Sequence, residues 1–131
     1  ALKADEEYSE ECINILQKIP GNFILAEPSI IYQEVCGTLA RRINTDVAKK
    51  AENLLDSLLH PRLIMECDIN LYKAAYTLCQ KYGIYPIDAL YLKTAINTNA
   101  ILISLDDKNF INKVKKKKPP IEAYHPSEFP Y

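Results

Sequence analysis

The chain has 131 residues, of which 48% are hydrophobic and 25% charged, and its formal net charge is −1. These proportions are typical of one globular domain with a single core, so we expect residues 1–131 to form one domain. The near-neutral charge excludes a global cationic field, and nucleic-acid binding would require a local basic patch. With no apolar run near the ~18 residues of a membrane span and no secretory signal, the sequence predicts a soluble, cytoplasmic protein without membrane contact.

The four cysteines are Cys12, Cys36, Cys67 and Cys79, and no two of them form a Cys-x-x-Cys pair. Their wide spacing favours small hydrophobic side chains over a disulfide framework or a zinc site. We therefore expect free thiols that bind no metal.

Helices and strands alternate along the sequence. Apolar residues at helical spacing predict a helix over residues 7–18, and a short apolar run predicts a strand over residues 23–26. The next predicted elements are a helix from Pro28, a helix capped by Thr45 or Asp46, a strand over 62–67, a helix from Asp68 to Gly83, a helix from Pro86, a strand over 100–105, a helix over 106–114 and a strand over 121–125. Apolar strands separated by helices favour an α/β fold, a three-layer α/β/α sandwich with a parallel sheet.

One carboxylate lies in the most apolar run of the chain, YGIYPIDALYLKTAI. It is Asp88, at about the third position of the helix that begins at Pro86. The helix dipole stabilises an anion there by only ~0.3–1 kcal/mol, which does not offset the cost of desolvating a carboxylate. A nearby cation is therefore expected.

Two further acids are predicted at the same edge of the sheet, because ligands of parallel α/β sheets bind at the carboxyl ends of the strands. Asp106 directly follows an apolar strand, although it also suits an ordinary helix N-cap. Glu34 projects over small side chains on its predicted helix, although it could simply pair with a lysine. Carboxylates that converge in one pocket repel each other, and a divalent cation is the usual remedy. Oxygen ligands favour Mg²⁺ or Mn²⁺.

Four segments in order resemble the PIN-domain ribonucleases, particularly the VapC-type toxins of toxin–antitoxin modules. They are PSIIYQEVCGTLARR, YGIYPIDALYLKTA, ILISLDDKNF and IEAYHPSEF. The resemblance implies that Glu34, Asp88 and Asp106 are catalytic, metal-binding acids of a Mg²⁺- or Mn²⁺-dependent endoribonuclease. It also implies that Ser104 supports the site with its hydroxyl and that Asn109 replaces a position often acidic in the family.

The start of the chain departs from this family. Its members begin with a central strand that ends in Asp-x-Ser, Asp-x-Asn or Asp-x-Thr and supplies the first acid, whereas ALKADEEYSEE resembles the segment after that strand. We interpret the chain as truncated before the first helix, since omitting a central strand would leave backbone groups unpaired in the core. The alternative is a protein that lacks this strand and one ligand.

Candidate RNA contacts are Arg41 and Arg42, which close the helix of Glu34, with Lys113 and Lys115 beyond Asp106. Phosphate binding by these groups predicts a steep salt dependence. Their simpler interpretation is a solvated lysine run and arginines that stabilise a helix C-terminus.

Apolar residues of the first helices, such as Tyr8, Ile15 and Leu39, are most simply part of the core. The resemblance suggests instead a homodimer face or a groove for a helix of an antitoxin protein. Tyrosines flank the acids, and Tyr91 is one candidate for stacking on bases.

Two other classes compete with the nuclease. A non-catalytic PIN-like module that binds RNA or protein is favoured by the missing first acid. A phosphoryl-transfer enzyme also gathers acids around Mg²⁺, but the chain has neither an early strand ending in Asp-x-Asp nor a glycine-rich phosphate loop.

Overall fold

The computed structural model describes residues 6–131. Its elements, in order, are α1 (Ser9–Leu16), β1 (Leu25–Pro28), η1 (Gln33–Gly37), α2 (Thr38–Arg42), α3 (Thr45–Leu58), β2 (Leu59–Met65), α4 (Ile69–Tyr82), α5 (Pro86–Thr98), β3 (Leu102–Ile103), η2 (Asp107–Ile111), α6 (Asn112–Lys116), β4 (Ala123–Tyr124) and η3 (Pro126–Glu128). The segments η1 and η2 are π-helical. Helices and strands alternate as predicted, and the α/β class is confirmed. None of the helices within residues 6–131 is long and apolar enough to cross a membrane.

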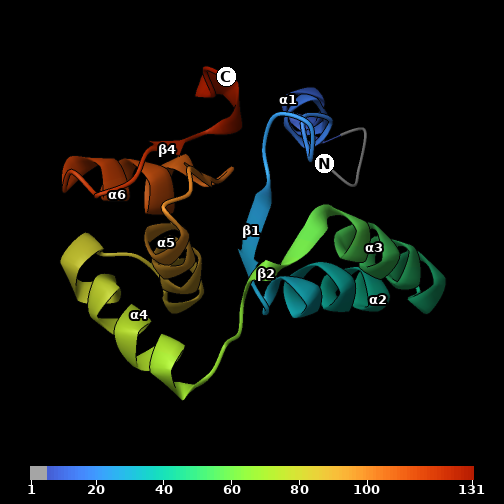
Figure 1. Cartoon of the computed structure of the whole chain (residues 1–131), viewed down its shortest axis with the longest axis horizontal. Coiled ribbons are helices and arrows are strands. Elements are labelled where there is room, and N and C mark those ends of the chain that lie inside the picture. Colours follow the sequence, from blue (N-terminus) through green and yellow to red (C-terminus); the bar gives the residue numbers. More distant parts are fainter. Residues whose placement is uncertain (1–5) are drawn as a thin grey trace.

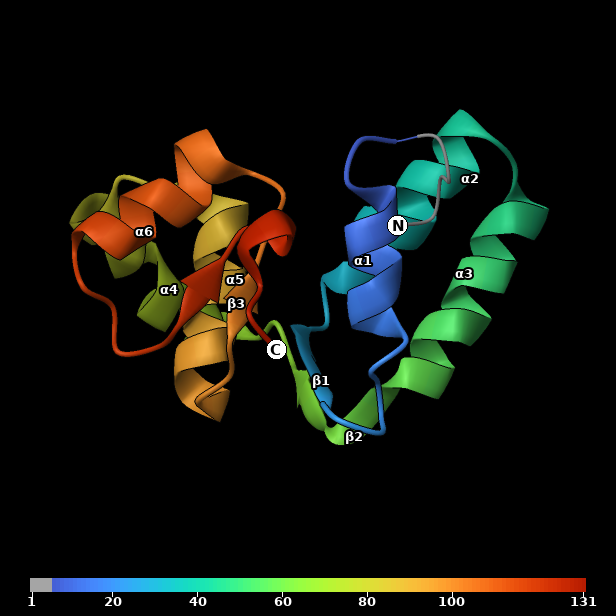
Figure 2. The same cartoon turned by 90° about the horizontal axis from the view of Figure 1, so that it is seen from above.

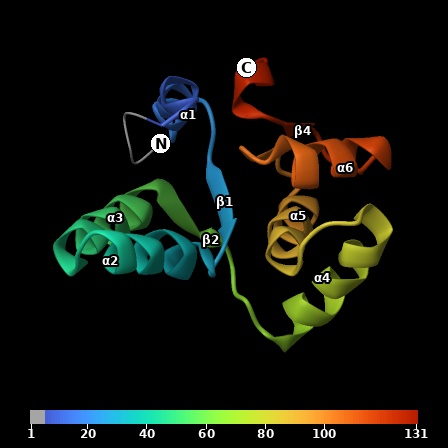
Figure 3. The ribbon, with the colours of Figure 1, turned by 180° about the vertical axis from the view of Figure 1, so that it is seen from behind.

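The strands are parallel, but residues 6–131 arrange them as two separate pairs. β1 pairs with β2, and β3 pairs with β4. In Figures 1 and 3, β1 and β2 lie between a group formed by α2 and α3 and a group formed by α4, α5 and α6. The parallel direction agrees with the sequence prediction, whereas the expected sheet is divided between β1 and β3.

The helix termini are determined by local chemistry. Asp68 caps α4 by accepting a 2.9 Å hydrogen bond from the Leu71 amide, and Gly83 ends the helix with a left-handed φ of 69°. The predicted cap of α3 is wrong, because Asn44, and not Thr45 or Asp46, accepts a 2.8 Å bond from the Val47 amide. In α3 and α4 a side chain that accepts from the first-turn amides therefore marks the start of the helix.

The strand predicted over residues 23–26 lies two residues later, over 25–28. Pro28 ends β1 and is buried instead of opening a helix. The next amide, of Ser29, donates a 2.8 Å bond to the Met65 carbonyl, which keeps the chain on β2 beyond Pro28. The helical segment that carries Glu34 therefore starts later than predicted.

The main core lies among α4, α5, β3, β4 and the η2–α6 segment. Its fully buried side chains include Leu92, Ile111 and Val114. Seen from above, α1 lies on the side of α2 and α3 (Figure 2), and this helix has no buried residue. The prediction that Tyr8 belongs to the core is wrong, since its side chain is 37% exposed. Ile15 is half-buried.

The four cysteines have free thiols and are half-buried, as the spacing predicted. They lie in α1, in η1, between β2 and α4, and in α4. Their surroundings are those of small hydrophobic residues, two of which pack against the main core.

Candidate functional site

Asp88 lies in the first turn of α5, two residues after Pro86, and is half-buried. Its pKa is raised above the ordinary value, first by burial and then by the negative charges of Asp106 and Glu34. Asp88 is therefore within electrostatic range of each of the other two predicted acids. Its desolvated and negative surroundings favour the protonated carboxyl group or the approach of a cation.

Asp106 follows β3 and is held by its neighbours. Its carboxylate accepts a 2.9 Å hydrogen bond from the Asn109 amide, and its own amide donates a 3.2 Å bond to Ser104 Oγ. Asp106 is thus the N-cap of η2, the simpler of its two interpretations, and this role fixes its orientation. Asn109 contacts Asp106 through its backbone, and Ser104 supports the turn with its hydroxyl.

Glu34 lies in η1, and its side chain is exposed. Tyr91, one turn after Asp88 on α5, lies close enough to interact with Glu34. Burial, followed by a hydrogen-bonding interaction with Glu34, raises the pKa of Tyr91 well above its ordinary value. The interaction of Tyr91 with Glu34 thus places α5 near η1.

A further acid, Glu27 of β1, was missed by sequence reasoning. Its side chain is largely buried, and burial followed by repulsion from Glu34 raises its pKa from 4.5 to about 7. The available signal was a charged residue in the apolar segment FILAEP, directly before Pro28. The candidate site therefore contains four carboxylates, of which Glu27 is the most desolvated.

The carboxylate oxygens of the candidate site are chemically suitable ligands for a hard divalent ion, because such an ion would reduce the repulsion between them. Within the described residues 6–131, no three His, Cys, Asp or Glu side chains are gathered closely enough to hold one ion as they stand. Binding of one ion by Glu34, Asp88 and Asp106 together would therefore require these side chains to approach one another.

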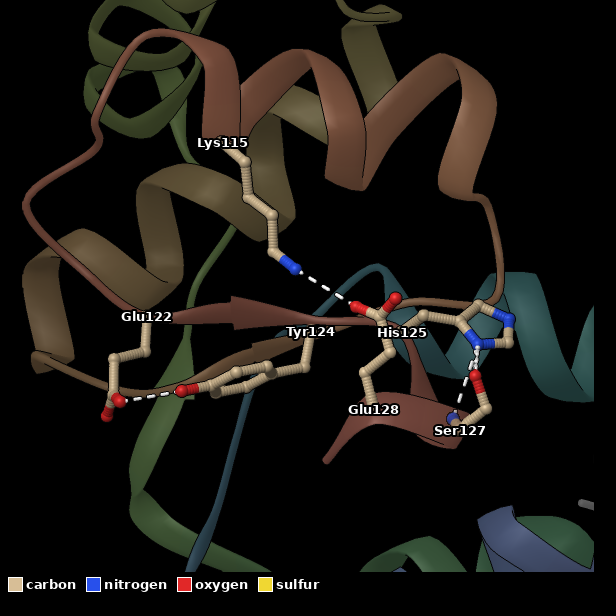
Figure 4. A network of polar contacts seen from close by, with 6 residues as sticks. All are labelled: Lys115, Glu122, Tyr124, His125, Ser127 and Glu128. Atoms are coloured by element: carbon tan, nitrogen blue, oxygen red, sulfur yellow. Dashed lines mark hydrogen bonds and ion pairs between the residues drawn. The ribbon is translucent and has the colours of Figure 1, made fainter. Parts of the chain in front are cut away.

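Two of the lysines that were predicted to contact RNA bind groups of their own chain. Lys113 Nζ donates a 2.8 Å bond to the Gly83 carbonyl at the end of α4. Lys115 forms a 3.1 Å ion pair with Glu128, and Figure 4 shows it reaching from α6 to the C-terminal segment. Arg41 and Arg42 are exposed in the last turn of α2. The arginines are thus better placed than these two lysines to meet a polyanion.

Replacing Asp106 by alanine should destabilise the fold by about 1 kcal/mol, because the first amides of η2 lose their cap. Asp106→Asn keeps an acceptor for the Asn109 amide and removes the charge, so its stability should stay close to that of the unmodified chain. Urea unfolding of the two variants measures the difference. Equal destabilisation by both changes would show that the charge, and not the cap, stabilises this turn.

Comparisons with known proteins agree with this architecture. The PIN domain model matches residues 1–117. The fold is similar to that of a chain in the crystal structure of VapBC2 from Rickettsia felis bound to a DNA fragment from their promoter, with a TM-score of 0.63 and 19% identity over 90% of this chain and 86% of that chain. No curated protein matches the chain. Because the family model spans most of the sequence, the protein belongs to the PIN domain family, and the resemblance seen in its motifs is confirmed.

Proposed function

We propose that this protein is a metal-dependent endoribonuclease, the VapC-type toxin of a toxin–antitoxin pair. The observation that carries the proposal is the electrostatic interaction of Asp88 with both Asp106 and Glu34, from the three separate segments α5, η2 and η1. Acids so arranged are suited to bind Mg²⁺ or Mn²⁺, and membership of the PIN domain family supports the assignment. The three residues are our proposed catalytic and metal-binding set.

Each side chain has a defined part in the proposed site. Asp106 is oriented by its cap bond, and Tyr91 lies near Glu34, within range to interact with it. Asp88 is placed by the start of α5, where the free amides of the first turn favour a carboxylate. Glu34, Asp88 and Asp106 would hold the divalent ion, which would supply activation of water and stabilisation of charge for hydrolysis of a phosphodiester. The chain's own contribution is therefore orientation and partial exclusion of water.

RNA would be held by cations that the fold leaves accessible. Arg41 and Arg42 lie on the helix that continues from η1, the segment of Glu34. The lysines at positions 116–118 are also exposed, whereas Lys113 and Lys115 contact groups of their own chain. We therefore assign the first phosphate contacts to the arginines, with binding that weakens as salt is added.

The proposed toxin function also implies which proteins this chain would bind. A chain of similar fold occurs in the VapBC2 complex, which supports an antitoxin protein as the partner of this chain. We propose in addition that the protein acts in the cytoplasm as a homodimer, with residues 1–131 belonging to a single PIN-like domain.

A non-catalytic PIN-like module that binds RNA or protein is the second candidate. The separation of the acids favours it, since no three carboxylates within residues 6–131 form a ready-made ion site. This candidate predicts binding without turnover. The nuclease proposal predicts turnover that depends on a divalent ion.

The decisive experiment is a cleavage assay on single-stranded RNA with the purified chain. We expect cleavage with Mg²⁺ or Mn²⁺ and none with a chelator, and readdition of the ion should restore it. RNA binding should be measured in the same samples. Binding without cleavage under every metal condition would contradict the nuclease and favour the non-catalytic module.

A further inference from the structure

A tyrosine is exposed at the beginning of α5, next to the proposed acid Asp88. Tyr85 is the N-cap residue of this helix and is 61% exposed. Pro86 follows it at the first helical position, and Tyr85 has the extended backbone, with φ of −70° and ψ of 153°, that a following proline favours. The aromatic ring therefore projects from a restricted backbone, and folding leaves most of the residue in solvent.

The position of Tyr85 relative to Asp88 follows from the first turn of the helix. Asp88 is the third helical residue, and the side chains of the N-cap and third positions lie next to each other, as in the capping box. The Tyr85 carbonyl accepts a 3.0 Å hydrogen bond from the Ala89 amide, which closes the turn that contains both residues. A ligand that meets Asp88 from solvent is therefore within reach of the Tyr85 ring.

Two other large apolar side chains are exposed near the proposed acids. Ile87 directly precedes Asp88, and Leu105 directly precedes Asp106. The two acids interact electrostatically, so these exposed side chains belong to one region of the fold. A single exposed apolar residue is normal on a protein surface, but here such residues flank both carboxylates. A ligand of this region would thus meet apolar surface as well as charge.

A cation lies near the same turn. Lys113 Nζ donates a 2.8 Å hydrogen bond to the Gly83 carbonyl, two residues before Tyr85. An ammonium group has three donors, and this bond uses one of them. An exposed aromatic ring near an ammonium group fits an anionic polymer with aromatic bases better than it fits an apolar peptide.

We propose that Tyr85 is a base-binding residue of the site, which stacks on an unpaired nucleobase beside the phosphate that lies at Asp88. Every base has an aromatic face, so this contact would hold the strand without selecting a sequence. A base inside a duplex is covered by its neighbours, so the contact would favour unpaired over paired nucleotides. This inference rests on the RNA binding of the proposed function.

The fluorescence of a Tyr85→Trp variant tests the contact directly. The chain contains no tryptophan, so the variant reports from position 85 alone. We expect quenching when single-stranded oligoadenylate is added with a chelator present, and much less quenching by a ribose-phosphate strand of equal length without bases. Tyr76→Trp is the matched control, because Tyr76 is 67% exposed on α4, and its fluorescence should stay constant.

Binding affinity gives a second measurement under the same conditions. Tyr85→Ala should weaken binding of oligoadenylate by at least ~5-fold, whereas Tyr85→Phe and Tyr76→Ala should bind like the unmodified chain. The alanine variant loses no phosphate contact, so the slope of log Kd against log salt concentration should stay the same. Urea midpoints of all these variants should lie close together, since both tyrosines are largely exposed.

The possible results separate this inference from the nuclease proposal. Equal affinities of Tyr85→Ala and the unmodified chain, or equal quenching by the strand without bases, would overturn the stacking role alone. A smaller molar mass of Tyr85→Ala in light scattering would also overturn it, because Tyr85 would then lie between two copies of the chain. Binding that depends on Tyr85 without cleavage under any metal condition would contradict only the nuclease. Absence of RNA binding by the unmodified chain would overturn both.

Discussion

Asp88→Asn should reduce metal-dependent RNA cleavage by at least ~100-fold while the protein remains folded. Asparagine has nearly the same size but lacks the charge that a divalent ion would meet. The folded state should not suffer, because Asp88 is partly desolvated and repelled by Asp106 and Glu34. Its stability in urea at neutral pH should equal or exceed that of the unmodified chain. Initial cleavage rates and unfolding midpoints, measured on the same preparations, give both quantities.

Asp107→Asn is the matched control for this change. Asp107 is exposed and directly follows Asp106, so the variant removes the same charge from the same edge of the fold. It should retain most of the cleavage activity. Unchanged cleavage by Asp88→Asn, or equal losses in both variants, would contradict a specific role for Asp88.

Elements with strong local signals were predictable from the sequence. Asp68 and Gly83 bound α4 as expected, and Pro86 begins α5. These boundaries depend on chemistry within one turn: a side-chain acceptor for free amides, a left-handed residue, and a ring without a backbone donor. The same local rules place Asp88 in the first turn of α5.

Features that depend on distant contacts were not predictable. The shift of β1 to Leu25–Pro28 reflects its pairing with β2, whose register places Glu27 beside Ile64 and Pro28 beside Met65. The division of the sheet between β1 and β3 is likewise a property of long-range pairing. Periodicity along one segment contains no information on which strand lies next to it.

The residues of the candidate site likewise include some that could be predicted from the sequence and some that could not. Asp88 could be proposed because it lies in the first turn of a helix, and Asp106 because it directly follows a strand. Acids at both kinds of position can bind ligands at the edge of a parallel sheet. Tyr91 and Glu27 acquire their roles only when α5 and β1 are brought to Glu34. A tyrosine among nine, or one glutamate next to a proline, carries little signal until its neighbours in space are known.

The pKa values of two of these acids are shifted in the same direction. Glu27 and Asp88 both have raised pKa values, with burial as the first cause and neighbouring carboxylates as the second. Each of them binds its proton more tightly in the folded chain than in the unfolded chain. Folding is therefore opposed by their ionisation, and the fold retains them at a cost in stability that a bound cation would offset.

The free energy of unfolding should decrease as the pH rises from about 4.5 to about 7, and the decrease should be much smaller in the Glu27→Gln variant. The pKa of Glu27 is raised from 4.5 to about 7 in the folded chain, so folding favours its protonated form below that range. The contribution is complete below about pH 4.5 and is lost as the pH passes 7. The shift corresponds to an upper limit of about 3 kcal/mol, by which the variant should exceed the unmodified chain at pH 8.

Urea unfolding at a series of pH values, in the presence of a chelator, measures this difference. Glu66→Gln is the control, because it removes the same charge from an exposed position between β2 and α4 and should keep the pH dependence of the unmodified chain. Asp88 contributes in the same direction, so a reduced slope should remain in Glu27→Gln. If Glu27→Gln and the unmodified chain lose stability in parallel between pH 4.5 and 8, Glu27 is hydrated in solution and its carboxylate does not oppose folding.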